Sequence, residues 1–204
     1  MGLFLKTLRR GVIFFILAGI FVSIPNLPPD SIYEAYSLPT AAPYEGLLAV
    51  NEALNKGERL FENEIPAPEA LAVYKNILYT GLADGRIVAL KNNKLVTVSN
   101  LAKPCSDKWN ATECGHILGI EFDKAGNLFA VDCYFGIYKI NITTGASSLI
   151  IPSNKPVAGK LPALPDDIAI ATDGSIYWSD ASAKFPLHEI LFSAFGDPSG
   201  RWSR

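Results

Sequence analysis

Residues 117–151 read ILGIEFDKAGNLFAVDCYFGIYKINITTGASSLII, and this stretch decides the fold class. Four short runs rich in β-branched and aromatic residues, at 117–122, 127–132, 136–140 and 147–151, are separated by residues typical of turns. No helical period of useful length interrupts them. The stretch therefore predicts a four-stranded antiparallel sheet.

The same unit recurs on both sides of this stretch. Upstream, strand-like runs occupy 70–98, and downstream a third copy begins at 168 and continues through a second run at 175–180. The first strands start near residues 70, 117 and 168, which are 47 and 51 residues apart. A four-stranded unit every 40 to 50 residues is typical of a β-propeller blade.

The chain holds only about two and a half such units, whereas propellers close with roughly 4 to 8 blades. We therefore expect an all-β, partial β-propeller over residues 65–204, cut from a longer propeller. An open sandwich of the same strands is the alternative. Open blade faces and strand edges predict marginal solubility and no activity for a chain of this length.

The amino terminus has a different pattern. Lys6, Arg9 and Arg10 precede an uncharged run, GVIFFILAGIFVSI, at residues 11–24. At a rise of about 1.5 Å per residue this run spans roughly 21 Å, short of a hydrocarbon core of about 30 Å, which suits a signal peptide. The run lacks an A-x-A-like cleavage site, which favours an uncleaved signal anchor.

We accordingly expect three parts. Residues 1–24 form a hydrophobic helix that contacts the membrane through 11–24, in a single-pass type II arrangement with the body in the lumen or outside. A secreted protein is the alternative. Residues 25–64 form a stalk with a possible short helix at 44–54, and residues 65–204 form the truncated propeller.

Sequons and cysteines agree with an oxidising compartment. Asn110 and Asn141 each begin an Asn-X-Thr triplet, the acceptor for N-glycosylation. Cys105 and Cys114 enclose eight residues and are expected to form a disulfide, with two free thiols as the alternative. Cys133 lies within a strand-like run and is expected to be a buried, inert thiol.

Composition excludes several classes of protein. Apolar residues make up 49% of the 204 residues, so wholesale disorder is excluded. Beyond the three amino-terminal basic residues, 15 basic groups face 20 acidic ones, which makes nucleic acid an unsuitable partner. Three cysteines and two histidines leave little material for a transition-metal cluster.

Acidic residues enter the innermost strand of two of the units. Glu69 follows Pro68 in the first, and Asp166 and Asp167 follow Pro165 in the third. The innermost strands of a propeller line its central channel, so these three carboxylates would converge on one axis. An all-oxygen ligand set of this kind fits Ca²⁺. Solvated loop charges are the alternative interpretation.

Four segments resemble the strictosidine synthase-like family, whose relatives include hemomucins, paraoxonases and gluconolactonases. They read APEALAV (67–73), LADGRIVAL (82–90), GHILGIEFDKAGNLFAVDCYFGIYKI (115–140) and LPDDIAIATDGSIYWSDASAKF (164–185). The resemblance implies a six-bladed propeller with calcium in its channel, and in several members an arylesterase or lactonase activity.

By position, the resemblance makes Glu69 a calcium ligand. Asp167 corresponds to the aspartate of an Asn-Asp ligand pair, and Asp166 stands where the family usually has the asparagine. This exchange adds a negative charge to the expected site.

His116 lies close to the position at which paraoxonase-type enzymes place a histidine, although Leu118 is the residue in register. We treat His116 as a weak catalytic candidate, and His188 as a weaker one. The leading hypothesis is a calcium-dependent hydrolase that acts on a small ester or lactone. The rival is a glycosylated adhesion or recognition propeller in which calcium is only structural.

Overall fold

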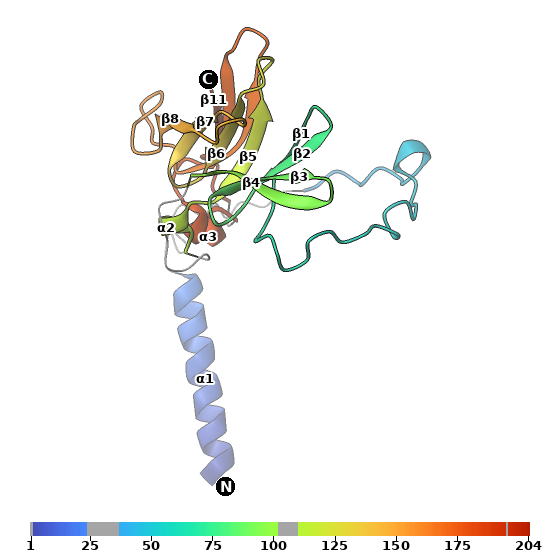
Figure 1. Ribbon diagram of the computed structural model, residues 1–204. Coiled ribbons are helices and arrows are strands. Elements are labelled where there is room, and N and C mark those ends of the chain that lie inside the picture. The colour runs from blue at the N-terminus through green and yellow to red at the C-terminus, as the bar shows by residue number, and fades with distance from the viewer. Residues whose placement is uncertain (1, 24–36, 102–109, 195) are drawn as a thin grey trace.

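The computed structural model describes residues 2–23, 37–101, 110–194 and 196–204, and three antiparallel sheets form its body (Figure 1). The first sheet, blade 1, contains β1 (Leu71–Tyr74), β2 (Ile77–Gly81), β3 (Arg86–Lys91) and β4 (Lys94–Asn100). Blade 2 contains β5 (Ile117–Phe122), β6 (Leu128–Asp132), β7 (Gly136–Ile140) and β8 (Ser147–Pro152). Blade 3 contains β9 (Leu164–Ile170), β10 (Ile176–Ser182) and β11 (Arg201–Ser203).

Strand order follows the chain in every sheet, so each sheet is a simple meander. Tight turns explain this order. Lys75 and Asn76 connect β1 to β2, and Asn92 and Asn93 connect β3 to β4, all with positive φ. Two residues with positive φ form the primed turn whose twist matches an antiparallel hairpin. The meanders and their stacking confirm the prediction of an all-β, partial propeller.

Each sheet buries a face against its neighbour. Tyr79 and Ile87 of blade 1 pack with Ile120 and Leu128 of blade 2 in one apolar cluster. A second cluster joins Val131 and other residues of blade 2 to blade 3. Blade 2 is thus covered on both faces, and its central strand β6 is buried throughout.

Glycines let strands of neighbouring blades approach each other closely. A Cβ atom on Gly81 would lie 2.2 Å from Cγ2 of Ile117. A Cβ atom on Gly119 would lie 2.7 Å from the carbonyl oxygen of Asp166 and 2.9 Å from the Cα atom of Asp167. Backbone cannot move aside as a flexible side chain can, so Gly119 sets the spacing between β5 and β9.

Short helices lie in two connections, one between blades 1 and 2 and one between β10 and β11 of blade 3. They are α2 (Ala111–Cys114), η2 (Leu187–Glu189) and α3 (Ile190–Ala194). The sequence did not predict them, because four or five residues are too few to show a helical period. The possible helix at 44–54 is reduced to the single turn η1 (Gly46–Leu48).

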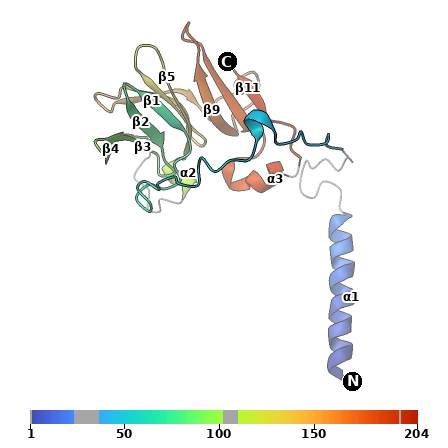
Figure 2. The same ribbon diagram turned by 90° about the vertical axis from the view of Figure 1, so that its right-hand side faces the viewer.

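The amino-terminal helix α1 (Gly2–Val22) projects away from the sheets (Figures 1 and 2). Within the part of the chain that the structure describes, no helix has the length and apolarity required to cross a bilayer. The signal anchor therefore stays a prediction.

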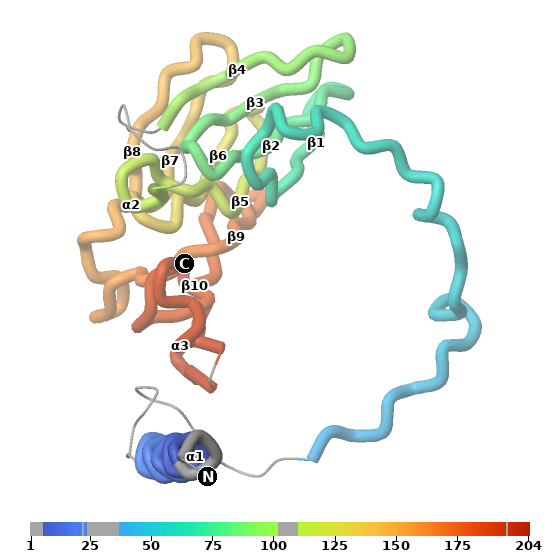
Figure 3. Tube along the Cα trace, turned by 90° about the horizontal axis from the view of Figure 1, so that it is seen from below, coloured from blue at the N-terminus to red at the C-terminus, as the bar shows by residue number. Residues whose placement is uncertain are grey.

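Residues 37–64 form an extended segment that sweeps in a wide arc around one side of the blades (Figure 3). Every residue from 37 to 60 is exposed. Residues 60–68 then return to blade 1 and lie over part of its outer face, where Leu60, Phe61 and Ile65 meet Leu78 and Leu90.

Candidate functional site

The three predicted ligands come from two blades on either side of blade 2. Glu69 lies two residues before β1, and Asp166 and Asp167 lie in β9. Both strands lie beside β5, the innermost strand of blade 2. The carboxylates of blades 1 and 3 therefore approach the same inner region, which we call the hub.

The pKa shifts of Glu69 and Asp166 indicate that the carboxylates of the hub repel one another. Burial raises the pKa of Glu69, and the negative charges of Asp166 and Asp167 raise this pKa further. The pKa of Asp166 is raised by burial and then by Asp167. Like charges raise one another's pKa only when they share a space that water screens incompletely.

Asp167 is oriented by hydrogen bonds within blade 3. Its backbone N–H donates to Oγ of Ser179 at 3.1 Å, and its Oδ1 accepts the N–H of Ile168 at 2.8 Å. Ser179 therefore holds the strand that presents Asp166 and Asp167. This is a positioning role, which sequence reasoning did not give to Ser179.

Blades 2 and 3 contribute apolar groups to the hub. Leu118, Cys133 and Leu164 form a buried cluster there. Cys133 is a free, buried thiol, which confirms the prediction for it. Burial raises its pKa most, and the carboxylates of Asp132, Glu69 and Asp166 raise it further. A thiol in this environment stays protonated and inert.

The donor chemistry of the hub suits a hard cation, because carboxylate oxygens are the ligands that Ca²⁺ prefers. The positions of these side chains do not form a complete metal site. Among the described residues, no three histidine, cysteine, aspartate or glutamate side chains are placed to hold a metal ion. The carboxylates of Glu69, Asp166 and Asp167 repel one another but do not surround a common position for a cation. Calcium binding therefore stays a prediction.

A pocket of about 330 Å³ contains both histidines of the sequence. His116, His188 and Tyr134 line it, together with Ala67 and Asn110. Ala67 lies two residues before Glu69, and Tyr134 follows Cys133 in the hub cluster. The structure therefore places the weak catalytic candidates in one pocket next to the hub.

The two histidines differ in their environments. Burial lowers the pKa of His116, so its imidazole is neutral at pH 7. His188 is tied to Tyr134, whose ring it stacks on and whose hydroxyl lies 3.2 Å from its Nδ1. The Tyr134 hydroxyl also accepts the backbone N–H of His188 at 3.1 Å. The pocket therefore contains one imidazole that burial keeps neutral, His116, and one that is tied to Tyr134, His188.

Asp132 is a buried carboxylate that sequence reasoning missed. It ends β6, and its Oδ1 accepts the N–H groups of Tyr134 and Phe135 at 2.9 and 3.0 Å. Its Oδ2 has no hydrogen-bond partner. Burial raises the pKa of Asp132 to about 6, against these bonds. Asp180 ends the equivalent run of blade 3, but an aspartate at the end of a strand does not by itself show that it is buried.

Ser179, Asp180 and His188 do not form a catalytic triad. Ser179 accepts a hydrogen bond from the backbone of Asp167. Asp180 is buried and paired with Arg201, whose Nε lies 2.8 Å from its Oδ2. His188 is held by Tyr134. Each group thus has a separate structural partner.

The sequons lie in different places. Asn141 is exposed after β7, and its Oδ1 accepts the N–H groups of Thr143 and Thr144. Asn110 is half-buried at the rim of the histidine pocket. Cys114 is buried in α2, but Cys105 lies outside the described residues, so their pairing stays a prediction.

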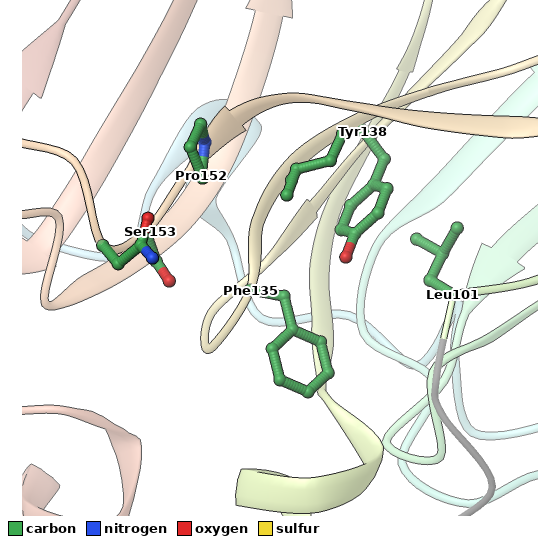
Figure 4. Close-up of a pocket in the computed structure, with 7 residues that line it drawn as sticks. Leu101, Phe135, Tyr138, Pro152 and Ser153 are labelled. Carbon is green, nitrogen blue, oxygen red and sulfur yellow. The ribbon is translucent and has the colours of Figure 1, made fainter.

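A second pocket, of about 310 Å³, lies where β4 of blade 1 meets blade 2 (Figure 4). Leu101, Phe135 and Tyr138 line it with Pro152 and Ser153. None of the predicted site residues lies in it. The residues that follow Leu101 are not described, so this pocket is not assigned a function.

Comparisons with known proteins agree with this architecture. A family model described as strictosidine synthase-like, N-terminal, matches residues 46–90. Adipocyte plasma membrane-associated protein Hemomucin of Drosophila melanogaster is 30% identical over 208 residues, covering 98% of this chain and 36% of its own. Adipocyte plasma membrane-associated protein of Rattus norvegicus is 32% identical over 196 residues, covering 92% and 52%.

The chain belongs to the strictosidine synthase-like family. It spans about a third to a half of the length of these two relatives.

Two solved structures have backbones similar to part of this chain. A gluconolactonase from Xanthomonas campestris has a TM-score of 0.45 and 17% identity, covering 57% of this chain and 35% of its own. A virginiamycin B lyase from Staphylococcus aureus has a TM-score of 0.43 and 14% identity, covering 56% and 35%. Both scores are below 0.5, so the fold assignment rests on the strand order and register described above.

Proposed function

We propose that this chain forms three blades of a propeller whose hub binds calcium, beside a pocket for a small ester or lactone. The observation that carries the proposal is that β1, which follows Glu69, and β9, which contains Asp166 and Asp167, both lie beside β5. The raised pKa of Glu69, to which the charges of Asp166 and Asp167 contribute, agrees with this placement. A cation would remove this repulsion, and its binding would lower the raised pKa values of Glu69 and Asp166. Family membership supports the proposal.

A titration calorimetry experiment on the full chain tests cation binding. We expect Ca²⁺ to bind, and Glu69→Gln to weaken the affinity at least about tenfold, because the variant removes one charged oxygen ligand. Glu58→Gln is the matched control, since Glu58 is exposed in the extended segment. No measurable Ca²⁺ binding, or equal loss in both variants, would contradict the proposal.

The proposed hydrolase uses the histidine pocket. The neutral imidazole of His116 can accept a proton from an attacking water molecule, and the apolar lining around it can hold a small ester. We expect the complete propeller to hydrolyse phenyl acetate, and this activity to be lost in His116→Gln and after chelation by EDTA, whereas the 204-residue chain alone is expected to be inactive. His188→Gln should have a smaller effect, because His188 is already held by Tyr134.

A recognition propeller without catalysis is the second candidate. A relative named Hemomucin and the exposed Asn141 sequon favour it. In that case Ca²⁺ would bind and stabilise the fold, while phenyl acetate and simple lactones would show no turnover. The calcium and hydrolysis measurements together therefore separate the two functions.

Location at a membrane or outside the cell is supported by the names of the relatives, which are plasma membrane-associated proteins. We propose that residues 11–24 attach the chain to the membrane with the body on the lumenal or outer side. Extraction by alkaline carbonate measures this attachment. A chain that is fully released from membranes by carbonate would contradict the anchor and favour the secreted alternative.

A further inference from the structure

Asp132 contacts the segments that carry both walls of the histidine pocket. It ends β6, its side chain is wholly buried, and its two carboxylate oxygens have different neighbours. The backbone of His116 pairs with the residue after Asp132, because the N–H of Cys133 donates to the carbonyl oxygen of His116 at 3.0 Å. Asp132 therefore lies where β5 and β6 meet beside this pocket.

The first oxygen of Asp132, Oδ1, holds the turn that carries Tyr134. It accepts the N–H groups of Tyr134 and Phe135 at 2.9 and 3.0 Å. The ring of Tyr134 stacks on that of His188, with ring centres 6.0 Å apart and planes at 13°. The Tyr134 hydroxyl also accepts the backbone N–H of His188 at 3.1 Å. Asp132 thus acts on the position of His188 through Tyr134.

Tyr134 also selects the tautomer of His188. The hydroxyl oxygen of Tyr134 lies 3.2 Å from Nδ1 of His188, and this oxygen already accepts one N–H group. Its own hydrogen is therefore available to Nδ1. On the other side of the ring, Nε2 lies 4.0 Å from a carboxylate oxygen of Glu189, and an ionised carboxylate only accepts hydrogen bonds. Both neighbours favour the tautomer in which His188 carries its hydrogen on Nε2.

The second oxygen of Asp132, Oδ2, lies against the segment that carries His116. A Cβ atom on Gly115 would overlap Oδ2 and lie 2.9 Å from Cγ of Asp132. Gly115 has a φ of +78° and immediately precedes His116. Among the residues that the structure describes, Oδ2 has no hydrogen-bond partner. This oxygen therefore acts on Gly115 by packing.

The side chain at position 132 has to meet two requirements at once. An apolar side chain of similar size would leave the N–H groups of Tyr134 and Phe135 without an acceptor, which is unfavourable in a buried site. A smaller acceptor would leave a space against Gly115. One planar group with an acceptor on one side and bulk on the other satisfies both.

We propose that Asp132 is a positioning residue that couples His116 to His188. One of its oxygens fixes the turn below His188, and the other supports the residue before His116, so the placement of both imidazoles in the 330 Å³ pocket depends on one side chain. A misplacement of about 1 Å at a reacting group can slow a reaction about a hundredfold. This catalytic consequence rests on the proposed hydrolase function, whereas the coupling itself does not.

NMR of the untagged full chain, labelled with ¹³C and ¹⁵N in histidine only, tests the coupling. The chain has two histidines, so each gives one set of ring signals, assigned with His116→Gln and His188→Gln. The measurement is made in a mild detergent at about pH 8.5, where an imidazole with an ordinary pKa near 6.5 is neutral. We expect His188 to show the Nε2–H tautomer in the wild type.

Two substitutions of Asp132 separate its roles. Asp132→Ala removes the acceptor for Tyr134 and Phe135, so it should convert His188 to a mixture of tautomers and also shift the signals of His116. Asp132→Asn keeps an oxygen for these N–H groups, so it should retain the wild-type tautomer of His188. Asp180→Asn, at the buried carboxylate of blade 3, is the control for a general loss of stability and should leave both sets of signals unchanged.

Gly115→Ala tests the coupling from the opposite wall. Its new Cβ atom would displace Asp132, so the signals of His188 should move although the substitution is next to His116. Gly174→Ala is the matched control. Gly174 has a φ of +86°, which gives the same kind of backbone strain, but its Cβ atom would meet nothing within 4 Å. Its His188 signals should match those of the wild type.

The proposal is overturned by a wild type in which His188 carries its hydrogen mainly on Nδ1, a result that requires no variant to fold. It is also overturned if Asp132→Ala or Gly115→Ala folds with unchanged His188 signals, or if Gly174→Ala shifts them equally. Phenyl acetate hydrolysis by the complete propeller is measured separately. Absence of turnover with the expected NMR signals would contradict the hydrolase and support the coupling, whereas turnover with unchanged signals in folded Asp132→Ala would overturn only the coupling.

Discussion

Burial decides the protonation of the acidic side chains around the hub. Asp132 is wholly buried with one unpaired oxygen, and its pKa is raised to about 6. The native state therefore holds a proton that the unfolded state, with a pKa near 3.9, has already released. Stability falls as the pH rises through this window, because the native state must then bury a charge.

Asp132→Asn should remove this pH dependence. The wild type is expected to lose up to about 3 kcal/mol of unfolding free energy between pH 4 and pH 7 from this group. The amide keeps an oxygen to accept the N–H groups of Tyr134 and Phe135, so the variant should be no less stable at pH 7. Urea unfolding at several pH values measures this.

Glu58→Gln, at an exposed site, is the control for the pH series and should follow the wild type. A variant Asp132→Asn that shows the same fall in stability as the wild type between pH 4 and pH 7 would show that Asp132 is not the group responsible.

The acidic ligand candidates could be predicted at this scale and Asp132 could not. Glu69, Asp166 and Asp167 stand at the entry to innermost strands, where propeller geometry gives a side chain a role. Asp132 looks like any turn aspartate in the sequence. Its importance comes from the packing of blade 2 between two neighbours, which removes it from water.

At the scale of elements, the strand pattern was predicted closely for blades 1 and 2. The expected strands at 117–122 and 136–140 agree with β5 and β7 in both bounds. In blade 3, β9 begins at Leu164 rather than near residue 168, because Pro165 and the two aspartates interrupt the apolar alternation. Register with β10 shifts at these positions, so the start of β9 is held by tertiary pairing.

Gly119→Ala should separate β5 from β9. The new Cβ atom would collide with the backbone of Asp166 and Asp167, which cannot rotate away. We expect a loss of about 1–3 kcal/mol in unfolding free energy, typical of overpacking at a tight site. Gly57→Ala is the control, since its Cβ atom would meet only the carbonyl oxygen of Leu54, at 3.3 Å.

The same variant tests the link between packing and the hub. Because the collision is with the two aspartates, Ca²⁺ affinity should fall in Gly119→Ala and stay unchanged in Gly57→Ala. Equal stability and equal affinity in both variants would contradict the close approach of β5 and β9.

At the scale of the whole molecule, the blades differ in how much neighbours cover them. Blade 2 is packed on both faces, whereas blades 1 and 3 each have one open face. Local opening requires less free energy where fewer apolar contacts are broken. Stability along the chain is therefore expected to be highest in the middle blade.

Hydrogen exchange can measure this gradient. Amides of β6 should exchange most slowly, and those of β1 and β11 at least about tenfold faster, because these strands bear the open faces. Uniform protection across the three blades would show that the sheets open as one unit and would contradict the gradient.

The sequence by itself determined the repeated four-strand unit, the turns at Asn92 and Asn93, and the acidic entries at Glu69 and Asp166. These are local properties, since strand alternation and turn conformation depend on neighbouring residues. Only the tertiary structure decided the shared pocket of His116 and His188 and the burial of Asp132. Those features depend on which blade packs against which, a relation between residues far apart in the chain that no short pattern encodes.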